Sequence, residues 1–169
     1  MVLKIRTIDF AKWGTFIGGI ATAVALVFLI LQTVTMMEDF DHTHRPWIGV
    51  EDVSITKADE VRFIVKNYGT LPNTNSKIMI SWGKEPLTRD FLIKNGKFLE
   101  GNVIMPGSDF SIIPDIPPQI IQAARNGGSL YLGIIIYYEY GNEKKKEYGA
   151  ILQYHEGDRF FFIHTWPEK

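Results

Sequence analysis

Residues 14–34 have the sequence GTFIGGIATAVALVFLILQTV, a run of 21 residues without a charged side chain. As an α-helix with a rise of about 1.5 Å per residue, this run spans roughly 30 Å, the thickness of the hydrocarbon core of a bilayer. A cleavable signal peptide has a shorter apolar region of about 7–15 residues, and the segment Thr33-Val34-Thr35 lacks the small residues of a cleavage site. The run therefore predicts a transmembrane helix over residues 14–35, in preference to a removed signal peptide or a buried helix of a soluble protein.

Charged residues flank this helix asymmetrically. Three basic residues precede it and three acidic residues follow it, namely Lys4, Arg6, Lys12, Glu38, Asp39 and Asp41. Because Lys and Arg are enriched in cytoplasmic loops, residues 1–13 are expected to form a cytoplasmic tail. A polar stalk at residues 36–45 and an outer domain at residues 46–169 would then lie on the far side of the membrane, in the periplasm or the extracellular space.

One face of the predicted helix carries small residues at spacings of three and four. They are Gly14, Gly18, Ala21, Thr22 and Ala25. Such a stripe lets the backbone of a second helix approach closely, so these five residues are candidates for helix packing. The alternative is that glycine and alanine are simply common in membrane helices.

Composition excludes several classes of protein. A chain of 169 residues has room for one ordinary domain beside the helix. Its net charge of −1 provides no basic field for nucleic acid, and the absence of cysteine excludes disulfides, zinc–thiolate sites and cysteine nucleophiles. Aromatic residues make up 13% of the chain and lie mostly after the helix, a distribution typical of β structure.

The outer domain alternates between apolar and polar residues over many short stretches. Val61, Phe63 and Val65 would face one side of a strand, and Arg62 and Lys66 the other. The expected strands are residues 47–55, 61–66, 77–82, 91–93, 97–99, 103–105, 109–113, 130–140, 148–154 and 159–165.

Two further segments of this domain have their own signatures. Proline at the start and glycine after the end predict a short helix over residues 118–126. The charged segment GNEKKKE at residues 141–147 predicts a hairpin tip. The fold class expected is mainly β, an immunoglobulin-like antiparallel β-sandwich with one short helix, attached to the N-terminal transmembrane helix.

Three short motifs carry a resemblance to known proteins. They are Arg45-Pro46-Trp47 before the first strand, Asn67-x-Gly69-x-x-Pro72 after the second, and the approximate pattern Tyr137, Glu139, Gly141. Together with the N-terminal anchor they resemble small uncharacterised bacterial single-pass membrane proteins with an immunoglobulin-like outer domain. The turn at residues 66–69 is also similar to adhesion-type immunoglobulin-like modules. The resemblance implies the bacterial cytoplasmic (inner) membrane and a periplasmic domain, and it implies no catalytic residue.

Motifs of catalysis are absent from the sequence. It contains no phosphate-binding loop, nucleophile elbow, paired-histidine metalloprotease motif or EF-hand loop, so we expect neither enzymatic activity nor a bound cofactor. Asp41, His42 and His44 are candidate metal ligands, because imidazole and carboxylate groups bind Zn²⁺ or Cu²⁺. The alternative is a hydrated acidic stalk with two ordinary histidines.

Two stretches are apolar on both faces of the expected strand, residues 130–138 and residues 160–163. Such a strand is either covered on both sides or part of a contact surface. The candidate interface residues are Tyr131, Tyr137, Phe161 and Ile163, and the alternative is that the helix at residues 118–126 covers the second face.

These observations favour a non-catalytic accessory or structural subunit of a larger membrane protein complex. Its expected partners are the lipid bilayer and other membrane protein subunits, bound through the helix and the outer domain, and not nucleic acid. The alternative is a membrane-tethered periplasmic binding module for a metal or a small ligand.

Overall fold

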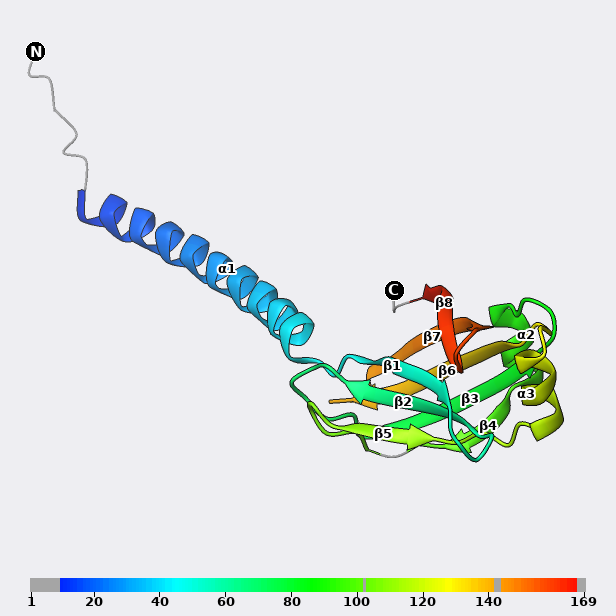
Figure 1. Cartoon of the computed structure of the whole chain (residues 1–169). Coiled ribbons are helices and arrows are strands. Elements are labelled where there is room, and N and C mark those ends of the chain that lie inside the picture. Colours follow the sequence, from blue (N-terminus) through cyan, green and yellow to red (C-terminus); the bar gives the residue numbers. More distant parts are fainter. Residues whose placement is uncertain (1–9, 102, 142–143, 167–169) are drawn as a thin grey trace, which may run out of the picture. The chain divides into compact units, whose positions relative to one another are not determined.

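The computed structural model describes residues 10–101, 103–141 and 144–166. The chain divides into two compact units, Met1–Thr43 and His44–Lys169. The first contains the helix α1 (Phe10–His44), and the second contains all the described strands and two short helices (Figure 1).

Helix α1 contains a segment that is long and apolar enough to cross a membrane. This segment runs from Thr15 to Phe40, and its 26 residues correspond to about 39 Å of helix. Side chains along the whole segment are exposed, which suits a surface solvated by lipid. The helix continues to His44, so the segment predicted as a polar stalk is helical almost to its end.

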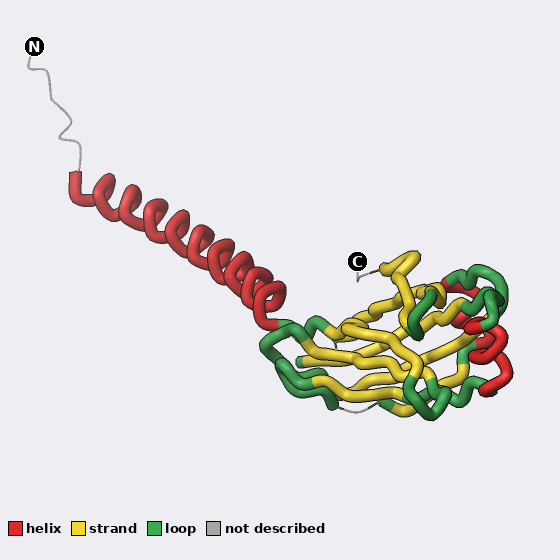
Figure 2. The backbone as a smooth tube through the Cα atoms, in the orientation of Figure 1, coloured by secondary structure: helices red, strands yellow, loops and turns green. Residues whose placement is uncertain are grey.

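The second unit is mainly β, as predicted (Figure 2). Its eight strands are β1 (Ile48–Ile55), β2 (Val61–Asn67), β3 (Asn75–Gly83), β4 (Lys97–Glu100), β5 (Asp109–Ile112), β6 (Tyr131–Tyr140), β7 (Lys144–His155) and β8 (Arg159–Trp166). They form one antiparallel sheet in the order β4-β3-β6-β7-β8-β1-β2-β5. The lysines at residues 144–146 belong to β7, which corrects their prediction as a hairpin tip, and residues 103–105 form no strand.

The sheet curls, so that β1, β2 and β5 lie across the face of the other five strands (Figure 1). Between β8 and β1 the ladder consists of a single residue pair, Ser54 with Arg159. The main core fills the space between these two groups of strands, and it includes Phe63, Ile134 and Leu152. Helix α3 (Pro118–Arg125), which the sequence predicts, adds Ile121 to this core.

Strand β6 is covered on both faces. Its even-numbered residues, such as Ile134 and Ile136, point into the main core. Ile135 belongs to a second core on the opposite face, where helix α2 (Arg89–Asn95) places Leu92 against it. The sequence predicts an edge strand around residues 91–93, and this prediction is wrong. Thr88 caps the first turn of α2, since its hydroxyl accepts a hydrogen bond from the backbone N–H of Phe91.

The immunoglobulin-like arrangement is not confirmed. The structure has one curled sheet of eight strands in place of two separate sheets. What it shares with the prediction is the antiparallel pairing and a core enclosed between two groups of strands.

A buried asparagine fixes the point at which the chain enters the domain. The Asn67 side-chain oxygen accepts hydrogen bonds from the backbone N–H groups of Trp47, at 3.1 Å, and Gly69, at 2.9 Å. Its side-chain nitrogen donates to the carbonyls of Leu71 and Ile104. A side chain at Gly69 would overlap the backbone of the entering segment. Part of the Asn-x-Gly motif that carries the resemblance is therefore explained by packing and hydrogen bonding.

Candidate binding surface on strands β7 and β8

A groove of about 920 Å³ lies on the outer face of the sheet, beside the loop that leads into α2. Much of its lining is apolar and comes from four elements that are distant in sequence: Pro86, Leu87, Tyr137, Ile151, Ile163 and Trp166. The volume is in the range of small-molecule sites in proteins, about 300–1,000 Å³. The groove is thus large enough to hold a ligand or a segment of another protein.

An ion pair forms one wall of this groove. The Nε and Nη2 atoms of Arg89 donate hydrogen bonds to the two carboxylate oxygens of Glu147, both at 2.7 Å. The indole N–H of Trp166 donates to the same carboxylate at 2.8 Å. This network joins the first residue of α2 to strands β7 and β8, so it holds three elements of the groove together.

The network also sets the charge of its members. The hydrogen bond from Arg89 holds the pKa of the Glu147 carboxyl below its usual value, although partial burial opposes the shift. The same contact raises the pKa of Arg89. Both groups therefore stay charged at neutral pH. Burial raises the pKa of the Tyr137 hydroxyl, which remains a neutral hydrogen-bonding group in the groove.

Gly149 makes room for the tryptophan of this network. A Cβ at Gly149 would overlap the indole of Trp166, which lies directly over it. The two residues are paired across β7 and β8. A glycine in the middle of a strand usually weakens it, so its presence here reflects this close approach.

Strand β8 is exposed along much of its length. The exposed fractions of Phe161, Phe162 and Ile163 are 57%, 44% and 52%. A bulge sets Ile163 out of register, because His164 pairs with Ile151 and Phe162 pairs with Leu152. On its other side β8 pairs with β1 only at Arg159, within the part of the chain that the structure describes. Most of β8 therefore offers a strand edge together with large apolar side chains.

The four predicted interface residues divide into two pairs. Phe161 and Ile163 are exposed on β8, whereas Tyr131 and Tyr137 are half-buried against the second core. Tyr137 and Ile163 both line the groove, although they are 26 positions apart in the sequence. No local pattern identifies Arg89 or Glu147, because their pairing joins residues 58 positions apart and Arg89 lies in a helix that was not predicted.

The predicted helix-packing residues lie in α1. Four of them are exposed: Gly18, Ala21, Thr22 and Ala25. The backbone of Gly14 is helical, and its exposure lies outside the described part. The Thr22 hydroxyl donates to the Gly18 carbonyl at 2.8 Å, within the same helix. Packing of a second helix on this face stays a prediction.

The predicted metal ligands lie at the end of α1. The side chains of Asp41 and His42 are outside the described part, and His44 is half-buried. Among the described side chains, no group of three His, Cys, Asp or Glu residues could hold a metal ion. The metal site therefore also stays a prediction.

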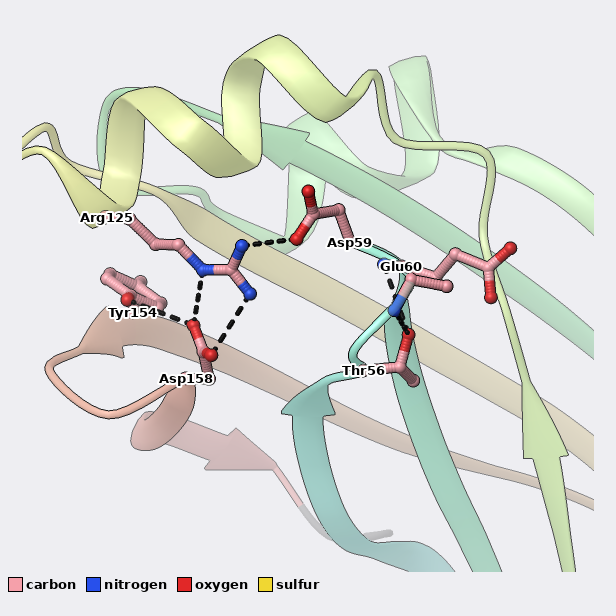
Figure 3. Close-up of polar contacts among 7 residues, drawn as sticks. Thr56, Asp59, Glu60, Arg125, Tyr154 and Asp158 are labelled. Atoms are coloured by element: carbon pink, nitrogen blue, oxygen red, sulfur yellow. Dashed lines mark hydrogen bonds and ion pairs between the residues drawn. The ribbon is translucent and has the colours of Figure 1, made fainter.

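A second polar cluster lies around Arg125, at the end of α3 (Figure 3). Its guanidinium donates to both carboxylate oxygens of Asp158, at 2.7 and 3.0 Å, and also pairs with Asp59. Asp59 and Asp158 lie in the β1–β2 and β7–β8 turns, each with a left-handed backbone (φ of 59° and 60°). The Tyr154 hydroxyl donates to Asp158. These contacts account for both carboxylates, so the cluster connects two turns and a helix and has a structural role.

Comparison with family models, with curated proteins and with solved structures finds no match to this chain.

Proposed function

We propose that this protein is a non-catalytic accessory subunit of a larger membrane protein complex, anchored by α1 and binding a neighbouring protein through strand β8. The observation that carries the proposal is the exposure of Phe161, Phe162 and Ile163 on a strand that is paired along one side and almost unpaired along the other.

Exposed edge strands are usually protected, because an unpaired row of N–H and C=O groups pairs readily with another chain. Lysine and proline are common protecting residues, but the middle of β8 has the sequence FFFI. Clustered exposed apolar side chains mark contact surfaces, and aromatic residues are enriched at the centres of protein interfaces. A partner protein that covers β8 would pair its open edge and bury its exposed apolar side chains.

The membrane location belongs to the same proposal. The span Thr15–Phe40 supports anchoring, and the basic residues before it support a cytoplasmic N-terminus in a bacterial inner membrane. The C-terminal domain would then be periplasmic. The stripe of Gly18, Ala21, Thr22 and Ala25 would pack against a helix of the same complex.

The finer description of the domain is also an inference. The single pair between β8 and β1 nearly separates the sheet into two layers, which supports a variant of the immunoglobulin-like sandwich. This arrangement would agree with the resemblance to bacterial single-pass membrane proteins.

The subunit hypothesis is tested by extracting the full chain from its native membranes in mild detergent and measuring the mass of the extracted species. We expect a species larger than the monomer, and the double variant Phe161→Ser/Phe162→Ser should lose the bound protein. The control is Phe98→Ser, which changes a phenylalanine on β4 that is 61% exposed, close to the 57% of Phe161. A chain that runs alone at monomer mass, or equal loss in both variants, would contradict the proposal.

The topology is tested separately. Because the chain has no cysteine, a single Lys57→Cys or Lys4→Cys substitution creates a unique thiol. A membrane-impermeant maleimide should label the first in intact spheroplasts and the second only after lysis. The reverse pattern would place the domain in the cytoplasm.

A further inference from the structure

We propose that the groove between α2 and strands β7 and β8 binds a long-chain carboxylate, with the apolar chain along the groove and the acidic head group at its basic rim. This proposal is separate from the subunit hypothesis, because Phe161 and Phe162 do not line the groove; Ile163 is the exposed β8 residue that belongs to both surfaces.

The apolar part of the groove fits an acyl chain. Leu87 and Ile151 are buried in the second core, and Ile163 is exposed at the groove wall. An extended chain lying along these side chains would leave water, and each buried CH₂ group contributes about 0.8 kcal/mol. The indole of Trp166 is fixed by Glu147 and Gly149, so that wall is preformed.

The polar part of the groove favours an anion. Three cationic side chains line it, Arg89, Lys145 and Lys146, against the single carboxylate of Glu147. That carboxylate already accepts hydrogen bonds from Arg89 and Trp166, so it is neutralised within the wall. The charges of Arg89 and Glu147 cancel within their pair, so the excess positive charge of the lining comes from Lys145 and Lys146. Lys145 lies 3.6 Å from the Glu139 carboxylate, but 77% of its side chain is exposed, so this surface contact is weak. A carboxylate head group would therefore meet net positive charge.

The membrane anchor supports a lipid-derived ligand over other anions. Helix α1 has a segment suited to a bilayer, and the domain begins directly after it in the sequence. Single-chain carboxylates partition into and out of such a bilayer. The cationic rim would contact the carboxylate of such a molecule, and the apolar groove would contact its acyl chain.

The proposal is tested with the full chain in nanodiscs of a zwitterionic phospholipid, by quenching of tryptophan fluorescence with a dibrominated stearate. The part of the quenching that disappears in Trp166→Phe reports the groove. We expect this part to saturate and to be reversed by unbrominated stearate. A dibrominated amine of the same chain length should quench Trp166 weakly. A phospholipid brominated on its chains, which stays in the bilayer, controls for simple proximity of the membrane.

Charge reversal provides the matched comparison. Lys145→Glu/Lys146→Glu should weaken stearate binding by about tenfold or more, a loss equivalent to about 1.4 kcal/mol. Lys84→Glu/Lys94→Glu makes the same charge change at exposed positions that do not line the groove and should leave binding within about twofold. Circular dichroism verifies the fold of each variant, and calorimetric titration of the unaltered chain with stearate gives a second, variant-independent measurement.

Three results would overturn the proposal. They are equal quenching by the carboxylate and the amine, no effect of the groove lysines, and displacement of stearate by an acidic apolar peptide that binds more tightly. Loss of the partner protein in Phe161→Ser/Phe162→Ser with normal stearate binding would keep this proposal. Loss of the partner protein in the same variant, without specific binding of stearate to the unaltered chain, would support the subunit hypothesis and overturn this one.

Discussion

Strands β6 and β8 have the same sequence signature and different surroundings. Both are apolar on both faces, with GIII in the middle of β6 and FFFI in the middle of β8. In β6 residues 132–136 are buried on both faces, whereas in β8 only Phe160 of this run is buried and Phe161, Phe162 and Ile163 are exposed. The difference arises from neighbours: β6 lies between β3 and β7 and is covered by α2, while β8 lies next to a nearly open edge.

An apolar strand can therefore have either of two roles. An apolar residue on a central strand stabilises the fold, and the same residue on an edge strand is available to a partner. Substitutions should therefore have effects on stability that decrease from β6 to β8. The measurement in each case is urea unfolding of the full chain in mild detergent, followed by tryptophan emission.

The largest effect is expected for Ile134→Ala on the inner face of β6. Ile134 is fully buried in the main core, so its truncation removes apolar contacts and leaves a cavity. We expect a loss of about 3–5 kcal/mol in the free energy of unfolding. A loss below 1 kcal/mol would mean that the main core is not packed as described.

A smaller effect is expected on the outer face, for Leu92→Ala in α2. Leu92 is fully buried against Ile135, but it belongs to the smaller core that borders the groove. We expect a loss of about 2–3 kcal/mol. Gly133→Ala alone should also destabilise the chain, since its Cβ would overlap the Leu92 side chain. Additive losses in the double variant would show that Leu92 does not pack on Gly133.

The link between α2 and β8 should respond to pH. In Glu147→Gln the ion pair with Arg89 is lost, at a cost of up to about 1 kcal/mol for such a partly exposed pair. Because the folded-state pKa of Glu147 is lowered, this contribution is fully present above the ordinary glutamate pKa of 4.5 that applies to the unfolded chain. It is lost as the pH falls through the folded-state value. The difference in stability between the two chains should thus shrink in acid, and a difference that grows in acid would refute the assignment.

The smallest effect is expected for Phe161→Ser on β8. Its side chain is mostly exposed, so the change in unfolding free energy should lie within about 0.5 kcal/mol. Solubility of the isolated chain should rise, since an apolar edge is blunted. A loss comparable to that of Leu92→Ala would show that Phe161 belongs to the core and would remove the basis of the β8 interface.

Local signals in the sequence were sufficient for much of the fold. Alternation located β2 and β3, a run of apolar residues located β6, and the proline and glycine punctuation located α3. Helix α2 was missed because its seven residues, RDFLIKN, are too few to show a helical period. Its capping residue, Thr88, was the available signal.

The candidate site was predictable only in part. The apolar excess of β8 identified Phe161 and Ile163 as exposed. Tyr131 is half-buried against the second core, which the sequence did not reveal, and its role at an interface stays a prediction. The groove itself depends on a contact between Arg89 and Glu147 that no local pattern contains.

The hydrogen bonds of Asn67 have a mechanical consequence. A force applied along the chain from the helix would reach the domain at Trp47, whose backbone is held by the Asn67 side chain and whose neighbour in sequence begins β1. Seven residue pairs then join β1 to β2, so a pull directed along β1 would load these pairs together. Bonds loaded in this direction must break together, whereas bonds at a peeled end break one at a time. Tension directed along β1 would therefore be resisted by the whole β1–β2 ladder and by the Asn67 hydrogen bond to Trp47.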